Sequence, residues 1–392
     1  MSILLRAWTI FHPPTPGKTP ISPEPGSKTG PVRIGLLGAA NIAPIALLLS
    51  ARSCPDAEVT VVGARSLQKA QAFAKRHGVG RAVQGYEAVL SDPEVDAVYN
   101  PLPNGLHYEW TMKALQAGKH VLLEKPATNT PGEAERIFAF AKEKGLVVLE
   151  AFHYQFHPAA QRLHAIVSSG ELGRVQKITA HLTAPSGFIK PDDIRFQYAL
   201  GGGAAMDMGC YVTSISRYLA GREPVEVIKA EPVLQDPGRE PLVDRRMEFT
   251  YLFPALEGEE RGPTAECVCD LSLPGWGPGG LLPRWPEMSV RVLCEAGEAG
   301  LNNFVMPVFF HSISVRSAKG RRTERAFTFG KGEGEQWWTT YRYQLQAFVD
   351  KVKGREPQHW ITGEDTVGNM RAVQMVYEKS GLGARPESDF EL

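Results

Sequence analysis

Residues 32–43 read Val32-Arg33-Ile34-Gly35-Leu36-Leu37-Gly38-Ala39-Ala40-Asn41-Ile42-Ala43. An apolar strand runs here into a tight turn of small residues, and the apolar residues 45–48 then begin a helix. Small residues in such a turn let the backbone approach a pyrophosphate, which the free N–H groups at the helix N-terminus hold. We therefore expect Gly38, Ala40, Asn41 and Ile42 to bind a dinucleotide. An ordinary strand–helix turn is the alternative, because Ala40 and Ala43 stand where glycines are usual.

The second strand bears on which dinucleotide is bound. Residues 58–66 form a β-branched run that ends where a Rossmann fold meets the adenine ribose. A chain that binds NAD usually carries Asp or Glu at this point, whereas this chain carries Ala64 and Arg65. A carboxylate would repel a 2′-phosphate, and a guanidinium binds it through paired, charge-assisted hydrogen bonds. The sequence therefore favours NADP, bound by Arg65, over NAD.

Strands and helices alternate up to about residue 150. The further expected strands are 95–99, 120–123 and 146–149, and the expected helices are 67–77, 107–117 and 131–144. This alternation predicts right-handed βαβ units in a parallel sheet. Later segments read mainly as strands, at 175–183, 225–234, 246–253, 265–273, 288–295 and 312–316, before helices at 337–353 and 364–380. We predict an α/β protein with a Rossmann domain at 31–150 and a sheet-based substrate domain at 151–392, whose last helices can pack back on the first.

Composition excludes several classes of partner. The 392 residues carry 43 basic and 43 acidic side chains, so no net charge attracts nucleic acid or an anionic membrane, and no apolar run is long enough to span a bilayer. Five cysteines indicate a reducing, cytoplasmic compartment rather than a disulfide framework. Cys267 and Cys269 alternate within a strand, and we expect no metal site. Residues 1–30, rich in proline, predict an extended arm on the surface or on a partner subunit rather than a targeting leader.

Three further motifs resemble those of the Gfo/Idh/MocA oxidoreductases. They are Asn100-Pro101-Leu102-Pro103-Asn104-Gly105-Leu106-His107, then Glu124-Lys125-Pro126, then Asp207-x-Gly209-x-Tyr211 after three glycines. Within that family the chain is most similar to the trans-1,2-dihydrodiol and D-xylose dehydrogenase (NADP) branch. The resemblance implies a second domain built on a large, open, mostly antiparallel sheet with helices on one face. It also implies oxidation of a sugar or diol hydroxyl, and a homodimer formed through the sheet. Gln155 stands where the family often has arginine, which leaves substrate choice open.

The chemistry of hydride transfer points to three side chains. Removing a hydride from a carbinol carbon requires a proton acceptor and a fixed positive charge near the developing alkoxide. Lys125 ends a strand at the carboxyl edge of the sheet, and Pro126 restricts its backbone. Tyr211 is the candidate base, with its pKa expected to fall beside an ammonium, and Asp207 lies one helical turn before it to orient Lys125 or the substrate. A surface lysine, a core tyrosine and a helix-start aspartate are the alternatives.

Residues in neighbouring loops complete the predicted site. We expect the cofactor to contact the loop after the fourth strand and the end of the fifth, at Asn100, Pro101, Leu102, Asn104, His107, Glu124 and Lys125. His153, Tyr154 and, less directly, His157 begin the second domain, and with Asp207 and Tyr211 they are expected to line the substrate pocket. The alternative function is a dinucleotide-binding regulator or sensor of the same fold without turnover, which retention of Lys125 and Tyr211 disfavours.

Overall fold

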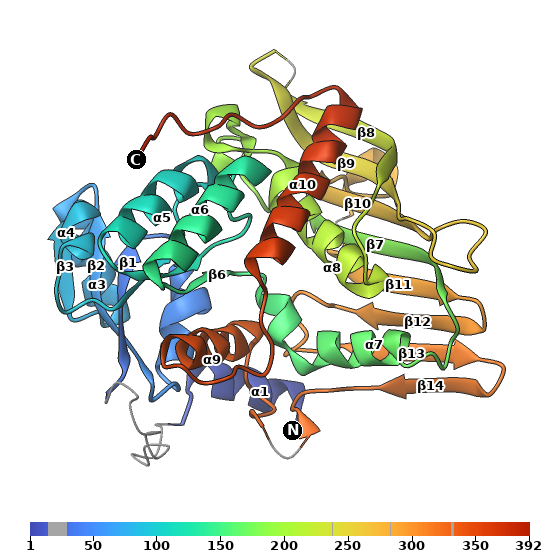
Figure 1. Cartoon of the computed structure of the whole chain (residues 1–392), viewed down its shortest axis with the longest axis horizontal. Helices are drawn as coiled ribbons and strands as arrows, with labels where there is room; N and C mark the ends of the chain where they lie inside the picture. The colour runs from blue at the N-terminus through green and yellow to red at the C-terminus, as the bar shows by residue number, and fades with distance from the viewer. Residues whose placement is uncertain (15–29, 237, 283, 331–332) are drawn as a thin grey trace.

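The computed structural model describes residues 1–14, 30–236, 238–282, 284–330 and 333–392. Two sheets lie side by side, the first in the blue N-terminal part of the chain and the second, coloured green to orange, in the part that follows (Figure 1). The predicted α/β fold is confirmed, with a parallel Rossmann sheet and a mostly antiparallel second sheet.

The first sheet has six parallel strands in the order β3-β2-β1-β4-β5-β6. The strands are β1 (Val32–Leu37), β2 (Ala57–Ala64), β3 (Arg81–Gln84), β4 (Ala97–Asn100), β5 (His120–Leu123) and β6 (Val148–Glu150). Parallel strands covered on both faces are apolar along their whole length, as β4 and β5 are. The strand order reverses between β1 and β4, so the loops that follow these strands open a crevice where ligands bind in such folds.

The helices of this half flank the sheet. They are η1 (Pro44–Leu48), α2 (Leu49–Ala51), α3 (Leu67–His77), α4 (Glu87–Leu90), η2 (Asn104–Leu106), α5 (His107–Gln116) and α6 (Pro131–Lys144). The helix expected after the glycine turn begins as a π-helical turn, η1, and only then becomes α-helical. Strand β3 was not expected, because four residues with two polar ends carry little periodic signal.

The second sheet has eight strands in the order β14-β13-β12-β11-β7-β10-β9-β8. They are β7 (Val175–Pro185), β8 (Glu226–Asp236), β9 (Glu240–Leu252), β10 (Thr264–Leu273), β11 (Met288–Cys294), β12 (Gly297–Asn302), β13 (Ser312–Ser317) and β14 (Gly320–Glu324). Only the pair of β7 and β10 is parallel. Side chains of β10 alternate between buried and more exposed from Ala265 to Cys269, so that Cys267 and Cys269 face the helices while Glu266 faces outward.

Helices cover one face of the second sheet (Figure 1). These are α7 (Pro158–Ser168), α8 (Cys210–Ala220) and α10 (Gly363–Ser380); α8 packs on β7 and β10, and α10 packs on β8. Short turns precede or join them: η3 (His153–Phe156), η4 (Ile194–Phe196), η5 (Tyr198–Leu200), η6 (Ala205–Gly209) and η7 (Pro278–Gly280). Helix α10 also contacts α6, and α9 (Thr340–Val352) contacts η1 and η3, so both helices join the two sheets.

The N-terminal segment differs from the extended arm that we expected. Helix α1 spans Ile3–Phe11, begins at Ser2, whose hydroxyl accepts from the backbone N–H of Leu5, and buries Arg6 and Ile10. The guanidinium of Arg6 stacks 3.8 Å from the centre of the Phe327 ring, which fixes the helix on the second sheet's half. The helix occupies only residues that precede the prolines, so it corrects the prediction for residues 3–11 alone. The proline-rich residues 15–29 lie outside the described part. Among the described helices, none is long and apolar enough to cross a membrane.

Candidate active site

Residues at the ends of four strands lie along the crevice. Gly38 follows β1, Arg65 follows β2, Asn100 ends β4, and Lys125 lies two residues beyond β5. Because the carboxyl ends of parallel strands share one edge, residues far apart in the sequence meet there. The loops of this edge also touch the second half of the chain, since the Asn104 amide donates to the carbonyl of Gly201 at 3.1 Å. The candidate site therefore lies where the two sheets' halves meet.

The glycine turn has the shape that a diphosphate requires. Gly38 adopts φ +89°, and its N–H donates to the Gly63 carbonyl at 2.7 Å, which closes the turn on β2. A Cβ on Gly38 would lie 3.1 Å from a methyl carbon of Leu102, so glycine is needed for both conformation and space. The backbone N–H groups of residues 40–42 have no acceptor among the described residues. These amides and the start of η1 fit the phosphates of a dinucleotide.

Arg65 lies exposed at the end of β2, and the side chain of Ala64 before it is buried. Among the described residues Arg65 forms no ion pair, which leaves its guanidinium available to a ligand. It is close enough to the Tyr86 ring for its charge to favour the phenolate, although burial dominates and raises the pKa of Tyr86. The position is the one at which the sequence predicts contact with a 2′-phosphate.

The loop after β4 is held rigidly by two side chains that were predicted to bind the cofactor. The buried amide of Asn100 donates to the His107 carbonyl and to Thr111, and its oxygen accepts from the N–H of Leu102. His107 is also buried, and its two ring nitrogens lie 2.8 and 2.7 Å from the carbonyl oxygens of Pro126 and Leu102. Burial lowers the pKa of His107 to about 4. These residues shape the loop, with Pro101 buried beside them, and His107 joins it to the segment after Lys125.

Lys125 is fixed by Asp207 across the crevice. Its Nζ lies 2.8 Å from the carboxylate Oδ1 of Asp207 and donates to the Asp207 carbonyl at 2.9 Å. The other carboxylate oxygen accepts from the Nε of Arg195 at 3.0 Å. Burial alone would raise the pKa of Asp207, but the charges of Lys125 and Arg195 lower it to about 2. Burial opposes the charge on Lys125, yet Asp207 outweighs it and raises the pKa of the lysine. Both groups are therefore ionised at neutral pH.

Tyr211 stands beside this ion pair. The Nζ of Lys125 lies 5.0 Å from the centre of the Tyr211 ring, and the phenol oxygen is 2.9 Å from Nε2 of His153. The Nδ1 of His153 is 2.8 Å from the Thr340 hydroxyl. Burial, helped by the charge of Lys125, lowers the pKa of His153 to about 3, so the imidazole is neutral.

The expectation of a lowered tyrosine pKa is wrong for this structure. Burial raises the pKa of Tyr211 well above its usual value, and the neighbouring Tyr341 and Glu124 add to the rise. The lysine lies over the ring rather than beside the oxygen, and its charge is already neutralised by Asp207. Tyr211 is therefore a neutral phenol, which suits it to donate a proton.

A local irregularity in the helix positions Asp207 and Tyr211. The segment η6 is a π-helical turn that carries Asp207 and continues into α8, which carries Tyr211 in its first turn. Turns of this kind occur frequently at functional sites, because they shift side chains relative to a regular helix. Gly203 precedes η6 at φ +138°, and a Cβ there would lie 2.3 Å from both Asp244 and Tyr377. The glycine run therefore lets η6 pack closely on β9 and α10.

The remaining predicted residues are buried and hydrogen-bonded within the protein, and their contacts with cofactor or substrate stay predictions. His153 supports Tyr211, and the buried hydroxyl of Tyr154 is 2.8 Å from the Ser214 hydroxyl. His157 accepts from the N–H of Ala159 at the start of α7 and packs against aromatic rings. The buried carboxylate of Glu124 accepts from the Tyr99 hydroxyl at 2.5 Å.

Sequence reasoning missed Arg195 and Thr340. Arg195 lies in the short turn η4 and Thr340 begins α9, so neither belongs to a motif. An Asp-x-x-Arg pattern at 192–195 was a weak available signal for the arginine, and no local signal marked Thr340. The five cysteines are buried and unpaired, and the described residues contain no cluster of three or more His, Cys, Asp and Glu side chains suited to a metal ion.

Comparisons with known proteins agree with this geometry. The family model described as "Oxidoreductase family, NAD-binding Rossmann fold" matches residues 32–152, and the model of the GFO/IDH/MocA C-terminal domain matches residues 160–253. The D-xylose 1-dehydrogenase (NADP(+)) 2 of Haloferax volcanii is 31% identical over 91% of this chain and 99% of its own length. A dTDP-3,4-didehydro-2,6-dideoxy-alpha-D-glucose 3-reductase of Actinomadura kijaniata is 42% identical over 48% of this chain; the match spans 56% of that reductase.

A solved structure extends the likeness to the whole fold. The crystal structure of KijD10, a 3-ketoreductase from Actinomadura kijaniata in complex with NADP and TDP-benzene, superposes with a TM-score of 0.74 at 28% identity. The match covers 92% of this chain and all of that one. The Rossmann sheet, the second sheet and their arrangement are thus shared with an NADP-bound 3-ketoreductase.

Proposed function

This chain belongs to the Gfo/Idh/MocA family of oxidoreductases, and on that basis we propose that it transfers a hydride between NADP(H) and a sugar or diol carbon. The observation that carries the proposal is the ionised pair of Lys125 and Asp207 beside the neutral phenol of Tyr211. Reduction of a carbonyl requires a fixed positive charge and a proton donor, both close to the carbonyl oxygen. The reverse reaction uses the same groups.

Each side chain has a defined task in this reaction. NADPH, when bound, supplies the hydride. Lys125 places its ammonium where negative charge develops on the substrate oxygen, and Asp207 with Arg195 keeps it charged and in position. Tyr211 donates its proton to that oxygen. In reverse, the phenol must first lose its proton, which its raised pKa disfavours at neutral pH.

The neutral histidine determines where the phenol proton points. When Nε2 of His153 carries the proton, the ring donates to the oxygen of Tyr211, and the Thr340 hydroxyl donates to Nδ1. The proton of Tyr211 is then free to reach the substrate. In the other tautomer Tyr211 donates to the histidine instead. His153 is thus a positioning residue, whose tautomer sets the direction of the tyrosine hydrogen bond.

NADP is the proposed cofactor because Arg65 occupies the position that reads the ribose. The exposed guanidinium at the end of β2 suits a 2′-phosphate, and no carboxylate stands at Ala64 to accept from a 2′-hydroxyl. The NADP-bound solved relative and the NADP-linked xylose dehydrogenase support this choice. The relatives act on a nucleotide-linked keto sugar or on xylose, so we propose a carbohydrate substrate before a dihydrodiol.

Steady-state kinetics with the full chain tests the proposal. The absorbance of reduced nicotinamide is followed with NADP and D-xylose, D-glucose and trans-dihydrodiols, and in reverse with NADPH and keto sugars, including a dTDP-linked one. We expect turnover with at least one carbohydrate and its loss in Lys125→Met. NADPH binding without turnover of any compound in the panel would contradict the proposal and favour a regulator.

We also propose a homodimer formed through the uncovered face of the second sheet. Helices α7, α8 and α10 pack on one face only, and outward side chains such as Glu266, Arg291 and Ser314 leave the other face exposed. Multi-angle light scattering should give about twice the 43.0 kDa of one chain. A mass of a single chain at micromolar concentration would contradict the dimer.

A further inference from the structure

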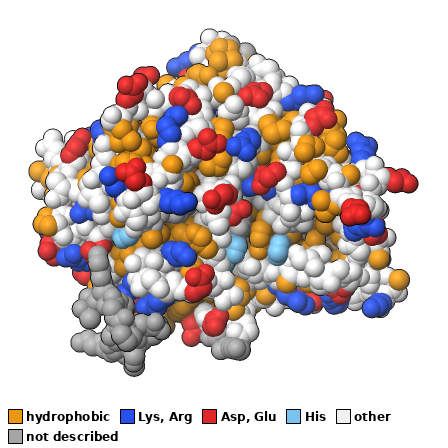
Figure 2. Space-filling view, in the orientation of Figure 1, with side chains coloured by type: hydrophobic (Ala, Val, Ile, Leu, Met, Phe, Trp, Pro, Cys, Tyr) orange, Lys and Arg blue, Asp and Glu red, His pale blue; other side chains and the backbone are white. Residues whose placement is uncertain are grey.

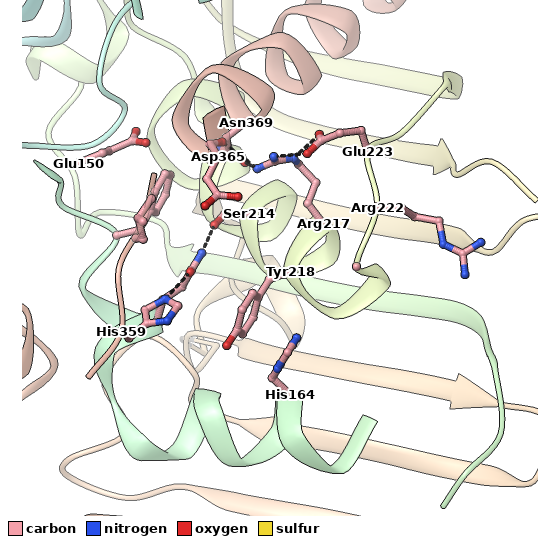
Figure 3. Close-up of a pocket in the computed structure, with 14 residues that line it drawn as sticks. Glu150, His164, Ser214, Arg217, Tyr218, Arg222, Glu223, His359, Asp365 and Asn369 are labelled. Carbon is pink, nitrogen blue, oxygen red and sulfur yellow. Dashed lines mark hydrogen bonds and ion pairs between the residues drawn. The ribbon is translucent and has the colours of Figure 1, made fainter. Parts of the chain in front are cut away.

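A cavity lies on the helical side of the second sheet, and Lys125, Asp207 and Tyr211 are not among the residues that line it (Figure 3). Its volume is about 480 Å³, within the ~300–1,000 Å³ range of ligand pockets. Helices α7, α8 and α10 supply His164, Tyr218 and Asp365, and His359 lies in the segment before α10. Figure 2 shows histidine side chains at the surface in the middle of this face. The first turn of α8 carries Tyr211, and its later turns carry the cavity residues Ser214 and Tyr218.

The floor of the cavity is built from buried polar side chains. Glu150, Gln155, Ser214, Arg217 and Asn369 line it, and each of them is less than a tenth exposed. Buried polar groups require partners, so a polar floor beneath an open cavity indicates a place for a ligand or for water. A shallow depression between loosely packed surface side chains would not require buried polar groups beneath it.

The hydrogen-bond donors of the floor are already used. The guanidinium of Arg217 donates to Glu223, to the Asp365 carbonyl and to Asn369. The amide nitrogen of Gln155 donates to Tyr154 and Ser214 at 3.3 and 3.0 Å. Both donor-rich side chains are thus satisfied within the protein and have little to offer an anion. Arg222, at the rim, is paired with Glu259 at 2.8 Å.

Most acceptors of the floor are also used, since Asn369 and Ser214 accept from Arg217 and Gln155, but two acceptors near the mouth are not. Because the Gln155 amide nitrogen is a donor, its oxygen accepts from Nε2 of His359 at 3.1 Å, which leaves Nδ1 of His359 as a bare acceptor. Asp365 uses one carboxylate oxygen to cap α10 through Thr362, and the other has no hydrogen bond among the described residues. Figure 3 shows the Asp365 carboxylate above the space that His359 and Tyr218 border.

From this pattern we infer that the cavity binds a neutral, polyhydroxylated molecule of about monosaccharide size. The unused acceptors of His359 and Asp365, with few free donors beside them, favour a ligand rich in hydroxyl donors, and a carboxylate at the mouth accepts hydroxyls strongly. The Tyr218 ring stacks on His164 at 4.1 Å, and Phe152 and Ile361 add apolar surface for the C–H groups of a sugar. The paired arginines disfavour a phosphate. This inference does not depend on the proposed hydride transfer, since no cavity residue named here takes part in it.

Calorimetric titration of the full chain with D-xylose, D-glucose and xylitol tests the inference, with ethanolamine as a cationic probe. We expect saturable binding of at least one neutral probe. His164→Trp should weaken it at least tenfold, because the larger ring extends over Tyr218 into the cavity. Ala165→Trp, on the exposed side of the same helix, should bind within twofold of wild type.

A second pair of variants tests the acceptor argument. Asp365→Asn keeps an oxygen for the helix cap but replaces a cavity acceptor by a donor, and we expect binding to weaken about fivefold. The neighbouring Glu364→Gln should leave it unchanged. The inference is overturned if no neutral probe binds, if His164→Trp and Asp365→Asn, folded as judged by thermal unfolding, bind like wild type, or if ethanolamine binds and the sugars do not. Hydride-transfer kinetics of the same variants keep this result separate from the proposed function.

Discussion

Replacing Asp207 by asparagine isolates the electrostatic part of the proposed mechanism. The pKa of Asp207 is about 2, against an ordinary value of 3.8. One pKa unit corresponds to about 1.36 kcal/mol. After the cost of burial, the charges of Lys125 and Arg195 therefore stabilise the carboxylate of Asp207 by roughly 2.4 kcal/mol. If half of this belongs to Lys125, the variant loses about 1.2 kcal/mol of the interaction that keeps the ammonium charged and in place for the substrate oxygen. That loss corresponds to roughly a tenfold fall in kcat/KM.

The variant should also change the pH dependence of the reaction. Asp207 raises the pKa of Lys125 against the effect of burial. Without the carboxylate, the buried lysine loses its proton at a lower pH, so activity should begin to fall at lower pH than in wild type. The assay is kcat/KM for carbonyl reduction with NADPH across the pH range. The uncharged amide of the variant can still accept one hydrogen bond from Lys125, so the geometry is kept.

Asp193→Asn is the matched control for this experiment. Asp193 pairs with the same Arg195 at 2.8 Å but does not contact Lys125. We expect Asp193→Asn to keep the wild-type rate within about threefold and the wild-type pH profile. An Asp207→Asn enzyme with unchanged kcat/KM and pH profile, or a control with the same defect, would refute the reasoning that Asp207 acts by holding Lys125 charged.

Three other predictions concern the catalytic groups, the cofactor and stability. Lys125→Met and Tyr211→Phe should each lower turnover roughly a hundredfold or more while NADPH binding, measured by fluorescence, stays intact; turnover within a few-fold of wild type would remove the residue from the mechanism. The double variant Ala64→Asp, Arg65→Ser should shrink or invert a preference for NADP over NAD that we expect to be about tenfold, from ~1.5–3 kcal/mol for a charged hydrogen bond; undiminished preference would show that this turn does not read the phosphate. Burial raises the pKa of Glu150 to about 7 from 4.5, so the stability contributed by the protonated carboxyl is full below pH ~4.5 and is lost as pH rises through about 7. Glu150→Gln should therefore reduce the pH dependence of the free energy of unfolding, measured with urea, by up to about 3 kcal/mol. An equal pH dependence in both proteins would contradict this prediction.

Local pattern was enough to predict the architecture. The glycine turn and the alternation of apolar strands with amphipathic helices predicted the Rossmann sheet, and the ends of most strands fell within a few residues of the observed ones. The N-terminal helix was missed because proline content nearby outweighed a short apolar periodicity. Strand β3 was missed because four residues are too few to show a period.

The sequence predicted which residues lie together in the candidate site, but not how they contact one another. Lys125, Asp207 and Tyr211 are contiguous in space, as their motifs indicated, yet the tyrosine pKa moved opposite to the expected direction. His153 lies with its Nε2 2.9 Å from the phenol oxygen of Tyr211, and its contact with substrate stays a prediction. The direction of the tyrosine pKa shift was not predictable because a pKa depends on burial and on all nearby charges, which no single motif contains.

What the amino-acid sequence determines by itself here is short-range: which segments become strands and helices, where the backbone must turn tightly, and which chemical groups stand at strand ends. These follow from side-chain periodicity and backbone sterics within a few residues. Only the tertiary structure decides that Arg195 shares Asp207 with Lys125, that Thr340 contacts His153, and that α7, α8 and α10 line a polar cavity. Those contacts join residues from 12 to 187 positions apart, and they are set by how sheets and helices pack rather than by any local preference.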